Sequence, residues 1–206
     1  MTRIYAISAA ALVAALLGGL MYFVLVDRGD AGFAQCRGEG VTVAGETLGG
    51  PFEMVDQHGN TVTDADVITQ PSLIYFGYTF CPDVCPIDVD RNAVAVDMLR
   101  ERGYDAKPVF ITVDPERDTP EVLEAYAANM HEDMIALTGT ADQVRETAQA
   151  YRAFYRKHES GDDFYLVDHS TFSYLVLPGH GFVEVFRRDM PPDDLADQVS
   201  CFIDAA

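Results

Sequence analysis

Two cysteines separated by three residues constrain this chain more than any other feature of its sequence. Cys81 and Cys85 follow residues 72–76, an apolar and β-branched run typical of a buried strand, and Pro86 stands where a helix is able to begin. The cysteines are therefore predicted to lie on a turn from strand to helix. If that turn is helical, both side chains project from one face, close enough to share a metal ion or to be joined by oxidation.

The spacing of the two thiols favours metal binding. Three residues lie between them, one more than in a thioredoxin-type dithiol. The wider turn admits a metal ion between two thiolates and still allows a disulfide to close. A disulfide that merely stabilises the turn is the alternative interpretation, because such bridges are common in oxidising compartments.

Strands and helices alternate along the chain, which predicts an α/β domain with crossover connections in its sheet. Strands are predicted at residues 51–55, 61–63, 72–76, 107–113, 134–137, 171–177 and 182–186. Helices are predicted from 86 to a stop at Gly103, from Pro120, from the capping box of Thr140 and Gln143 as far as Tyr155, and from 192 to 203. This order is that of a thioredoxin-like domain with an added N-terminal β-hairpin.

Residues 1–26 are predicted to form a transmembrane anchor. Residues 4–26 are an apolar run of 23 residues without a charged side chain, long enough to span a bilayer. A cleaved signal peptide, the alternative, has a shorter apolar core and a small-x-small cleavage site. Arg3 favours a cytoplasmic N-terminus. We therefore expect a single-pass inner-membrane protein whose soluble domain lies on the periplasmic or intermembrane-space side.

Glycine content and charge complete the predicted organisation. Residues 27–48 are rich in glycine and read as a tether, which leaves residues 49–206 for one thioredoxin-like domain.

The chain holds 14 basic and 33 acidic residues, a formal net charge of -19. This excess of acid argues against nucleic acid and against anionic membrane surfaces as partners.

His169 is the predicted third metal ligand. It stands in the segment 165–170, on a loop that a thioredoxin-like fold brings against the cysteine turn. Two thiolates and one imidazole form a soft donor set, which suits copper, with zinc as the competing metal. A structural, inert histidine is the alternative. Asp168 is either a hydrogen-bond partner that orients the His169 ring or a surface acid.

Five short motifs in this order resemble the Sco/SenC family of copper-binding, thioredoxin-like assembly proteins. They are GGPF at 49–52, FGYT at 76–79, CPDVCP at 81–86, DPERDT at 114–119 and DHS at 168–170, and the resemblance spans residues 49–186. The family's two cysteine ligands fall on Cys81 and Cys85, and its histidine ligand falls on His169. Phe80 departs from many relatives, which carry histidine before the first cysteine.

The resemblance implies a membrane-tethered copper chaperone. Its expected cargo is copper as Cu(I) or Cu(II), and its expected partners are cytochrome c oxidase subunit two, whose binuclear copper centre it helps to assemble, and other copper chaperones. A thiol:disulfide oxidoreductase that reduces the cysteines of the same target is the alternative. A thiol peroxidase is a third reading, but Ile74 and Tyr78 stand where its Pro and Thr belong.

Cys36 and Cys201 lie outside the family motifs. If Cys81 and Cys85 are kept for copper, the other two cysteines of an extracytoplasmic domain are left for each other. We therefore predict a disulfide between Cys36 and Cys201. The alternative is a pair of unrelated cysteines, one in the last helix and one free in the tether.

Overall fold

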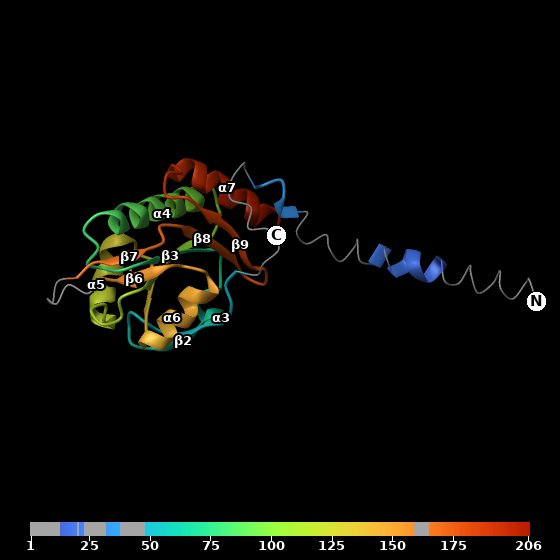
Figure 1. The fold of residues 1–206 in the computed structure, drawn as a ribbon. Coiled ribbons are helices and arrows are strands. Elements are labelled where there is room, and N and C mark those ends of the chain that lie inside the picture. The colour runs from blue at the N-terminus through green and yellow to red at the C-terminus, as the bar shows by residue number, and fades with distance from the viewer. Residues whose placement is uncertain (1–12, 20, 23–31, 38–47, 159–164) are drawn as a thin grey trace, which may run out of the picture.

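A mixed seven-stranded sheet forms the centre of the protein (Figure 1). The computed structural model describes residues 13–19, 21–22, 32–37, 48–158 and 165–206. The strand order in the sheet is β2-β1-β5-β4-β3-β8-β9, and β6 and β7 form a separate two-stranded ribbon. Since β1 pairs antiparallel with β2, this is the predicted α/β fold with an added N-terminal hairpin.

The elements follow the predicted alternation of strand and helix. The strands are β1 (Glu53–Asp56), β2 (Thr61–Thr63), β3 (Ser72–Gly77), β4 (Lys107–Thr112), β5 (Ile135–Thr138), β6 (Tyr155–Lys157), β7 (Val167–His169), β8 (Ser173–Leu177) and β9 (Gly181–Phe186). The helices are α3 (Asp64–Val67), α4 (Val84–Glu101), α5 (Pro120–Met130), α6 (Ala141–Ala150) and α7 (Pro192–Asp204).

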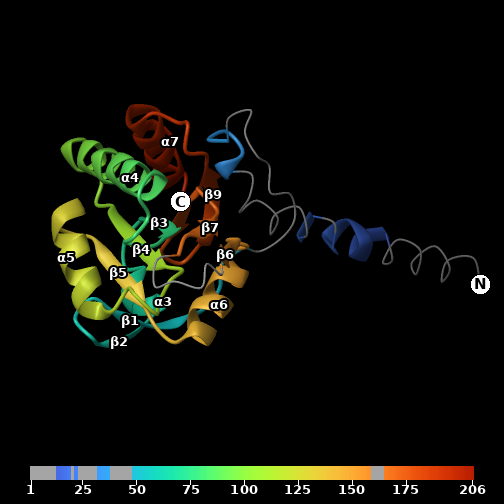
Figure 2. The ribbon, with the colours of Figure 1, turned by 60° about the vertical axis from the view of Figure 1, so that its left-hand side comes forward.

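The parallel strands β3 and β4 lie at the centre of the sheet, and every residue of both is buried. Such strands are covered by other elements on both faces, so residues 73–76 and 108–111 are all apolar, while the polar Ser72, Lys107 and Thr112 stand at the strand ends. Leu73 belongs to a core shared with α4 and α7, whereas Phe76 packs on Tyr151 and Tyr174 on the opposite side. Figure 2 shows α4 beside α7 on one face of the sheet and α6 on the other.

Helix α6 ends earlier than predicted, at Ala150, and Tyr155 begins β6 instead. The spacing of Val144, Tyr151 and Tyr155 continues a helical period, so the apolar pattern contains no stop signal. Arg152 ends the helix with a φ of 51°, a left-handed conformation that is more often occupied by glycine. The sequence prediction therefore missed the β6–β7 ribbon.

Most of the predicted anchor, residues 1–26, lies outside the described residues. The part that is described, residues 13–19 and 21–22, is helical. Among the residues that the structure describes, no helix has both the length and the apolar character that crossing a membrane requires. Of the predicted tether, residues 32–37 and 48 are described.

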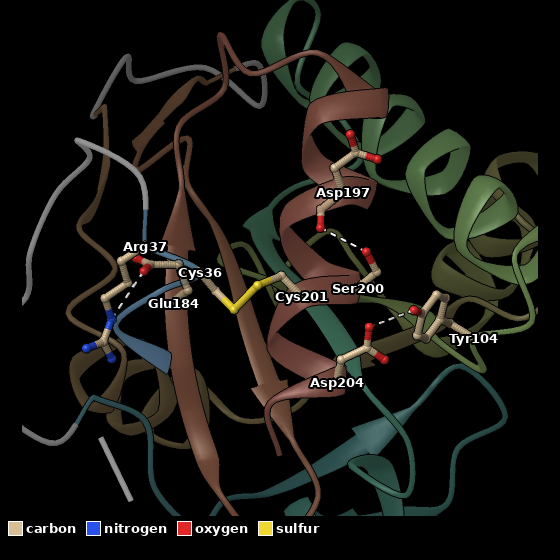
Figure 3. The surroundings of a disulfide bond; sticks show 8 residues. All are labelled: Cys36, Arg37, Tyr104, Glu184, Asp197, Ser200, Cys201 and Asp204. Atoms are coloured by element: carbon tan, nitrogen blue, oxygen red, sulfur yellow. Dashed lines mark hydrogen bonds and ion pairs between the residues drawn. A yellow bond between two sulfur atoms is a disulfide. The ribbon is translucent and has the colours of Figure 1, made fainter. Parts of the chain in front are cut away.

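Cys36 is joined to Cys201 of α7 by the disulfide that the sequence predicts (Figure 3). The two sulfur atoms are 2.01 Å apart, and the bridge spans 165 positions of the sequence. Phe33 is buried beside it, with its ring centroid 5.7 Å from that of Phe202. The segment before the domain is thus fastened to the last helix by a covalent bond and by apolar packing.

Arg37 extends this attachment to the edge strand β9. Its guanidinium pairs with Glu184 at 3.5 Å, and it donates a hydrogen bond to the carbonyl oxygen of Val183 (Figure 3 shows the ion pair). We call residues 32–37 the N-terminal clasp.

The N-terminal clasp lies at the end of the sheet opposite the cysteine turn. Strand β8 runs antiparallel to β3, with Tyr75 opposite Ser173 and Ser72 opposite Val176, so the β8–β9 turn lies beside the start of β3. Phe33 contacts His180 of that turn, with ring centroids 5.7 Å apart. The cysteine turn follows the other end of β3. The chain therefore enters the domain about one strand length away from that turn.

We expect the double substitution of Cys36 and Cys201 by serine to destabilise the domain. Without the bridge the unfolded chain regains the entropy of an open loop, about 5 kcal/mol for a loop of this length in the chain-entropy model. Urea titration should show the free energy of unfolding reduced by up to this amount. The parent protein, unfolded under reducing conditions, is the matched control. Equal stability of the oxidised parent and the variant would contradict the prediction.

Candidate metal centre

The cysteine turn joins the buried end of β3 to the start of α4. Helix α4 begins at Val84, so Cys85 lies in its first turn and Cys81 precedes it in the connecting loop. Pro86 is also within this first turn, where a missing N–H costs no helical hydrogen bond. The sequence placed the helix start at Pro86, two residues too late. The backbone N–H of Cys85 lies 3.4 Å from Cys81 Sγ and donates to it, as expected at a helix N-terminus.

Glycine at position 77 leaves room for the second thiol. A Cβ atom at Gly77 would lie 2.9 Å from Cys85 Sγ and 3.0 Å from the rings of Phe110 and Tyr75. All three neighbours are at most 1% exposed, so the packing around them leaves no room for them to move aside. The last residue of β3 therefore lets α4 bring its thiol against the sheet.

His169 reaches the cysteines from the ribbon that the sequence analysis missed. It is the last residue of β7 and pairs with Tyr155 of β6. Tyr75 and Tyr78 meet its ring edge-on, at centroid distances of 6.0 and 5.8 Å. The hydroxyl of Tyr78 also accepts a hydrogen bond from the backbone N–H of Val167 at 3.3 Å. Two aromatic rings and one hydrogen bond thus hold the imidazole beside the cysteine turn.

The structure brings the three predicted ligands together. The sulfur atoms of Cys81 and Cys85 and a ring nitrogen of His169 all lie within 4.8 Å of one another. Cys85 Sγ is 3.1 Å from His169 Nε2. Cys81 and Cys85 are 8% and 1% exposed and are free of any disulfide, so the site is recessed beneath the surface.

Hydrogen bonds orient the donors of this cluster. His169 Nδ1 is 2.9 Å from the carbonyl oxygen of Ser170, which only accepts, so Nδ1 donates to it and Nε2 is the ring nitrogen that faces Cys85 Sγ. The hydrogen bond from Cys85 lowers the pKa of Cys81 well below its usual range. The same bond, together with burial, raises the pKa of Cys85. At neutral pH the pair therefore holds one proton, and the negative charge is favoured on Cys81.

The predicted hydrogen bond between Asp168 and His169 is wrong. Asp168 pairs with Arg156 at 3.0 Å and with His158 at 2.8 Å, on the exposed side of the ribbon. Successive side chains of a strand point to opposite faces, so a residue next to an inward-facing histidine faces outward. The carbonyl oxygen of Ser170 takes the place that the sequence analysis gave to Asp168.

A loop after β4 connects the two ligand-bearing segments, and sequence reasoning gave its residues no role. Asp118 is fully buried and accepts hydrogen bonds from the backbone N–H of Thr79 at 3.0 Å and from the hydroxyls of Thr79 and Thr112, both at 2.6 Å. Asp118 thereby ties the cysteine turn to the end of the neighbouring strand. The sequence did contain one signal for Asp118. This residue follows a strand that runs parallel to β3, and the ends of parallel strands meet at one edge of a sheet.

Arg117 makes the corresponding contacts toward His169. Its side chain pairs with the buried Asp114 and donates to the carbonyl oxygen of Tyr165 at 3.0 Å, just before β7. The guanidinium carbon also lies 3.6 Å from the centre of the Tyr165 ring and 4.9 Å from that of Phe80. One loop therefore positions both the cysteine turn and the histidine strand.

The donor set determines what the site can hold. Two cysteine sulfurs and one imidazole nitrogen are soft and borderline ligands, which suit copper or zinc and not magnesium or calcium. The two thiols can also be oxidised to a disulfide after a small movement of the turn.

Comparison with known sequences points to a single protein family. A sequence model of the SCO1/SenC family matches residues 41–204. Protein SenC of Rhodobacter capsulatus is 50% identical over 200 residues, which cover 97% of this chain and 90% of that protein.

Solved structures give the same answer for the fold. The copper-bound crystal structure of ScoI from Arabidopsis thaliana has a TM-score of 0.73 at 38% identity, over 76% of this chain and 99% of that chain. Copper-bound yeast Sco1 has a TM-score of 0.72 at 35% identity, over 78% of this chain and 91% of that chain. The thioredoxin-like fold of this chain is thus the one shared by these proteins.

Replacing Asp168 by alanine should leave metal affinity almost unchanged, because the carboxylate faces away from the ligand it adjoins. Loss of a partner that did orient a ligand typically weakens binding by about 10 to 100-fold. We expect a change of less than about threefold in a competitive Cu(I) titration, well below that range. Replacement of His158 by alanine is the matched control for the exposed ion pair. A tenfold loss in the Asp168 variant alone would restore the predicted role of this carboxylate.

Proposed function

Because this chain belongs to the SCO1/SenC family, we propose that it is a copper metallochaperone that binds copper through Cys81, Cys85 and His169. The observation that carries the proposal is the convergence of these three donors, drawn from segments 84 positions apart, within 4.8 Å of one another. Copper is the cargo, and two relatives of known structure hold copper. Bound copper is a property of those two proteins, and the donor set of this chain is the reason to propose copper here.

The proposed acceptor is cytochrome c oxidase subunit two, whose binuclear copper centre the protein would help to assemble. Family membership supports an assembly role. Other copper chaperones are the proposed donors. The surface of the domain would meet each partner at the cysteine turn, where copper enters and leaves.

We place the protein in the inner membrane, with the domain on the periplasmic or intermembrane-space side. The apolar run of 23 residues at 4–26 supports an anchor. The Cys36–Cys201 disulfide supports an oxidising compartment for the domain.

A thiol:disulfide oxidoreductase acting on the cysteines of the same target is the second candidate. The lowered pKa of Cys81 favours it, because the thiolate is the nucleophile of disulfide exchange. Both activities use the same pair of thiols, so copper binding and disulfide exchange are expected to exclude each other.

Anaerobic titration of the reduced full-length protein with Cu(I) and with Cu(II) tests the proposal directly. A chaperone binds one equivalent of copper tightly, and its Cu(II) form shows sulfur-to-copper charge-transfer absorption. Weak or non-stoichiometric binding, together with rapid exchange with a disulfide of subunit two, would favour the oxidoreductase instead.

Replacing His169 by alanine should weaken copper binding while the domain stays folded. The variant loses the only imidazole of the cluster described above, and the Cu(II) spectrum should change because nitrogen ligation is lost. His180 lies in the β8–β9 turn at the far end of the sheet, so His180→Ala is the matched control. Unchanged affinity and spectra in the His169 variant would eliminate this residue as a ligand.

Copper affinity should rise with pH around neutrality. The lowered pKa of Cys81 and the raised pKa of Cys85 leave one proton on the pair of thiols there. Binding through both sulfurs must displace that proton, so the logarithm of the association constant should increase by about one per pH unit. Potentiometric measurement of proton release during titration checks this value. Release of no proton would contradict ligation by Cys85.

A further inference from the structure

A buried carboxylate lies one helical turn beyond Cys85. Asp88 is 1% exposed and follows Cys85 by three positions, so both residues are on one face of α4. Burying a carboxylate is unfavourable unless other groups donate hydrogen bonds to it. The metal site described above uses no atom of Asp88, and the sequence analysis gave this residue no role. The groups that pair with Asp88 therefore have to explain why an acid is buried here.

The first partner of Asp88 is Tyr75 of β3. The Tyr75 hydroxyl donates to Asp88 Oδ2 at 2.9 Å, and both residues are 1% exposed. Burial raises the pKa of Tyr75 most strongly, and the charges of Cys85 and Asp88 raise it further, so the hydroxyl keeps the hydrogen that it donates. This hydrogen bond holds the start of α4 against a central strand of the sheet.

The second partner of Asp88 is Arg188, in the loop that follows β9. Its Nε lies 3.4 Å from Asp88 Oδ1, so different elements pair with the two carboxylate oxygens. Arg91, three positions after Asp88, donates to the carbonyl oxygen of Arg187 at 2.7 Å and to Ser173 Oγ at 2.6 Å. The loop after β9 is therefore fastened to α4, which keeps Arg188 within reach of the buried acid.

The ring of Tyr75 lies against two of the three metal ligands. It meets the His169 ring edge-on, with the centroids 6.0 Å apart. A Cβ atom at Gly77 would lie 3.0 Å from the Tyr75 ring and 2.9 Å from Cys85 Sγ, so the ring and the sulfur are neighbours. A displacement of Tyr75 would therefore move an imidazole and a thiol together.

The two oxidation states of copper differ in what they require from His169. Thiolates are soft ligands that select Cu(I), whereas Cu(II) favours a tetragonal set with nitrogen or oxygen donors. Cu(II) therefore loses more than Cu(I) when the imidazole is free to move away from the two sulfur atoms.

We propose that Tyr75 and Asp88 are positioning residues of the metal centre, and that the hydrogen bond between them sets the relative affinity of the site for Cu(II) and Cu(I). This inference rests on the proposed function and adds two residues that are not ligands. Arg188 supports Asp88, and Asp88 acts on the ligands through the ring of Tyr75.

Tyr75→Phe, Asp88→Ala and the double variant test the proposal in the full-length protein, by competitive titration with Cu(I) and with Cu(II). Each variant should lower the ratio of Cu(II) to Cu(I) affinity about tenfold, which raises the reduction potential of bound copper by about 59 mV. Both single substitutions remove the same hydrogen bond, so the double variant should show no larger change than either one. Asp88→Asn keeps an oxygen that accepts from Tyr75, so its ratio should stay within about twofold of the parent.

The reduced, metal-free protein gives a readout that does not depend on copper. The NMR signals of the His169 ring protons are sensitive to the aromatic ring that meets the imidazole edge-on. These signals should shift in Tyr75→Phe and in Asp88→Ala, and they should keep their parent positions in Asp88→Asn.

Two variants are matched controls. Tyr174→Phe removes the hydroxyl of a buried tyrosine whose ring packs on Phe76 and Tyr151, on the opposite face of the sheet. Asp97→Ala removes a carboxylate of the same helix, one that pairs with His131 at 3.3 Å. Neither control should change the affinity ratio or the His169 signals.

Parent ratios and parent His169 signals in Tyr75→Phe and Asp88→Ala would overturn the positioning proposal and leave the proposed function intact. Additive effects in the double variant would also overturn it, because the two residues would then act separately. An Asp88→Asn variant that behaves like Asp88→Ala would assign the effect to the charge of Asp88 and not to the hydrogen bond. Failure of the parent to bind copper would refute the proposed function, and the His169 signals would still decide whether this bond positions the imidazole.

Discussion

The metal centre depends on the hydrogen bonds that the buried carboxylate of Asp118 accepts. An acid with no exposed surface is unfavourable by itself, and burial raises the pKa of Asp118, while hydrogen bonds from Thr112 and Thr79 act in the opposite direction. Those bonds connect the end of β4 to the cysteine turn, so the strand pairing at the centre of the sheet extends into the loop that carries Cys81. Leaving a buried hydrogen-bonding group without its partner costs about 1–3 kcal/mol. Loss of the bonds to Asp118 would also free the loop that positions Cys81.

The same loop controls the distance between ligands that are far apart in the sequence. Asp118 holds the turn of the cysteines, and Arg117 holds the backbone before β7, so the two sides of the site share one support. Gly77 completes the arrangement by letting Cys85 approach the sheet closely. A site built from elements that are each fixed by buried contacts is ordered before the metal arrives, which reduces the cost of binding.

The sequence contained most of the fold and the ligands, but not the parts that depend on three-dimensional context. The apolar strand before Cys81, the capping box at Thr140 and the hairpin β1–β2 follow from local patterns, and the structure has all three. The β6–β7 ribbon was not predicted because α6 ends at Arg152 in a left-handed conformation, and no glycine stands there to mark the end of the helix. The role given to Asp168 failed because adjacency in sequence does not imply a shared face of a strand. The hydrogen bonds of Asp118 join segments that are far apart in the chain, so no periodic pattern in the sequence predicts them.

The disulfide of the N-terminal clasp has a topological consequence. Cys36 and Cys201 enclose the complete sheet, its helices and all three metal ligands within one covalent ring of the chain. If a protease cuts the backbone once at any loop inside that ring, both fragments remain linked through sulfur. A single nick therefore releases no part of the domain from the segment that precedes Cys36, and complete loss of the metal site requires a second cut or reduction of the bridge.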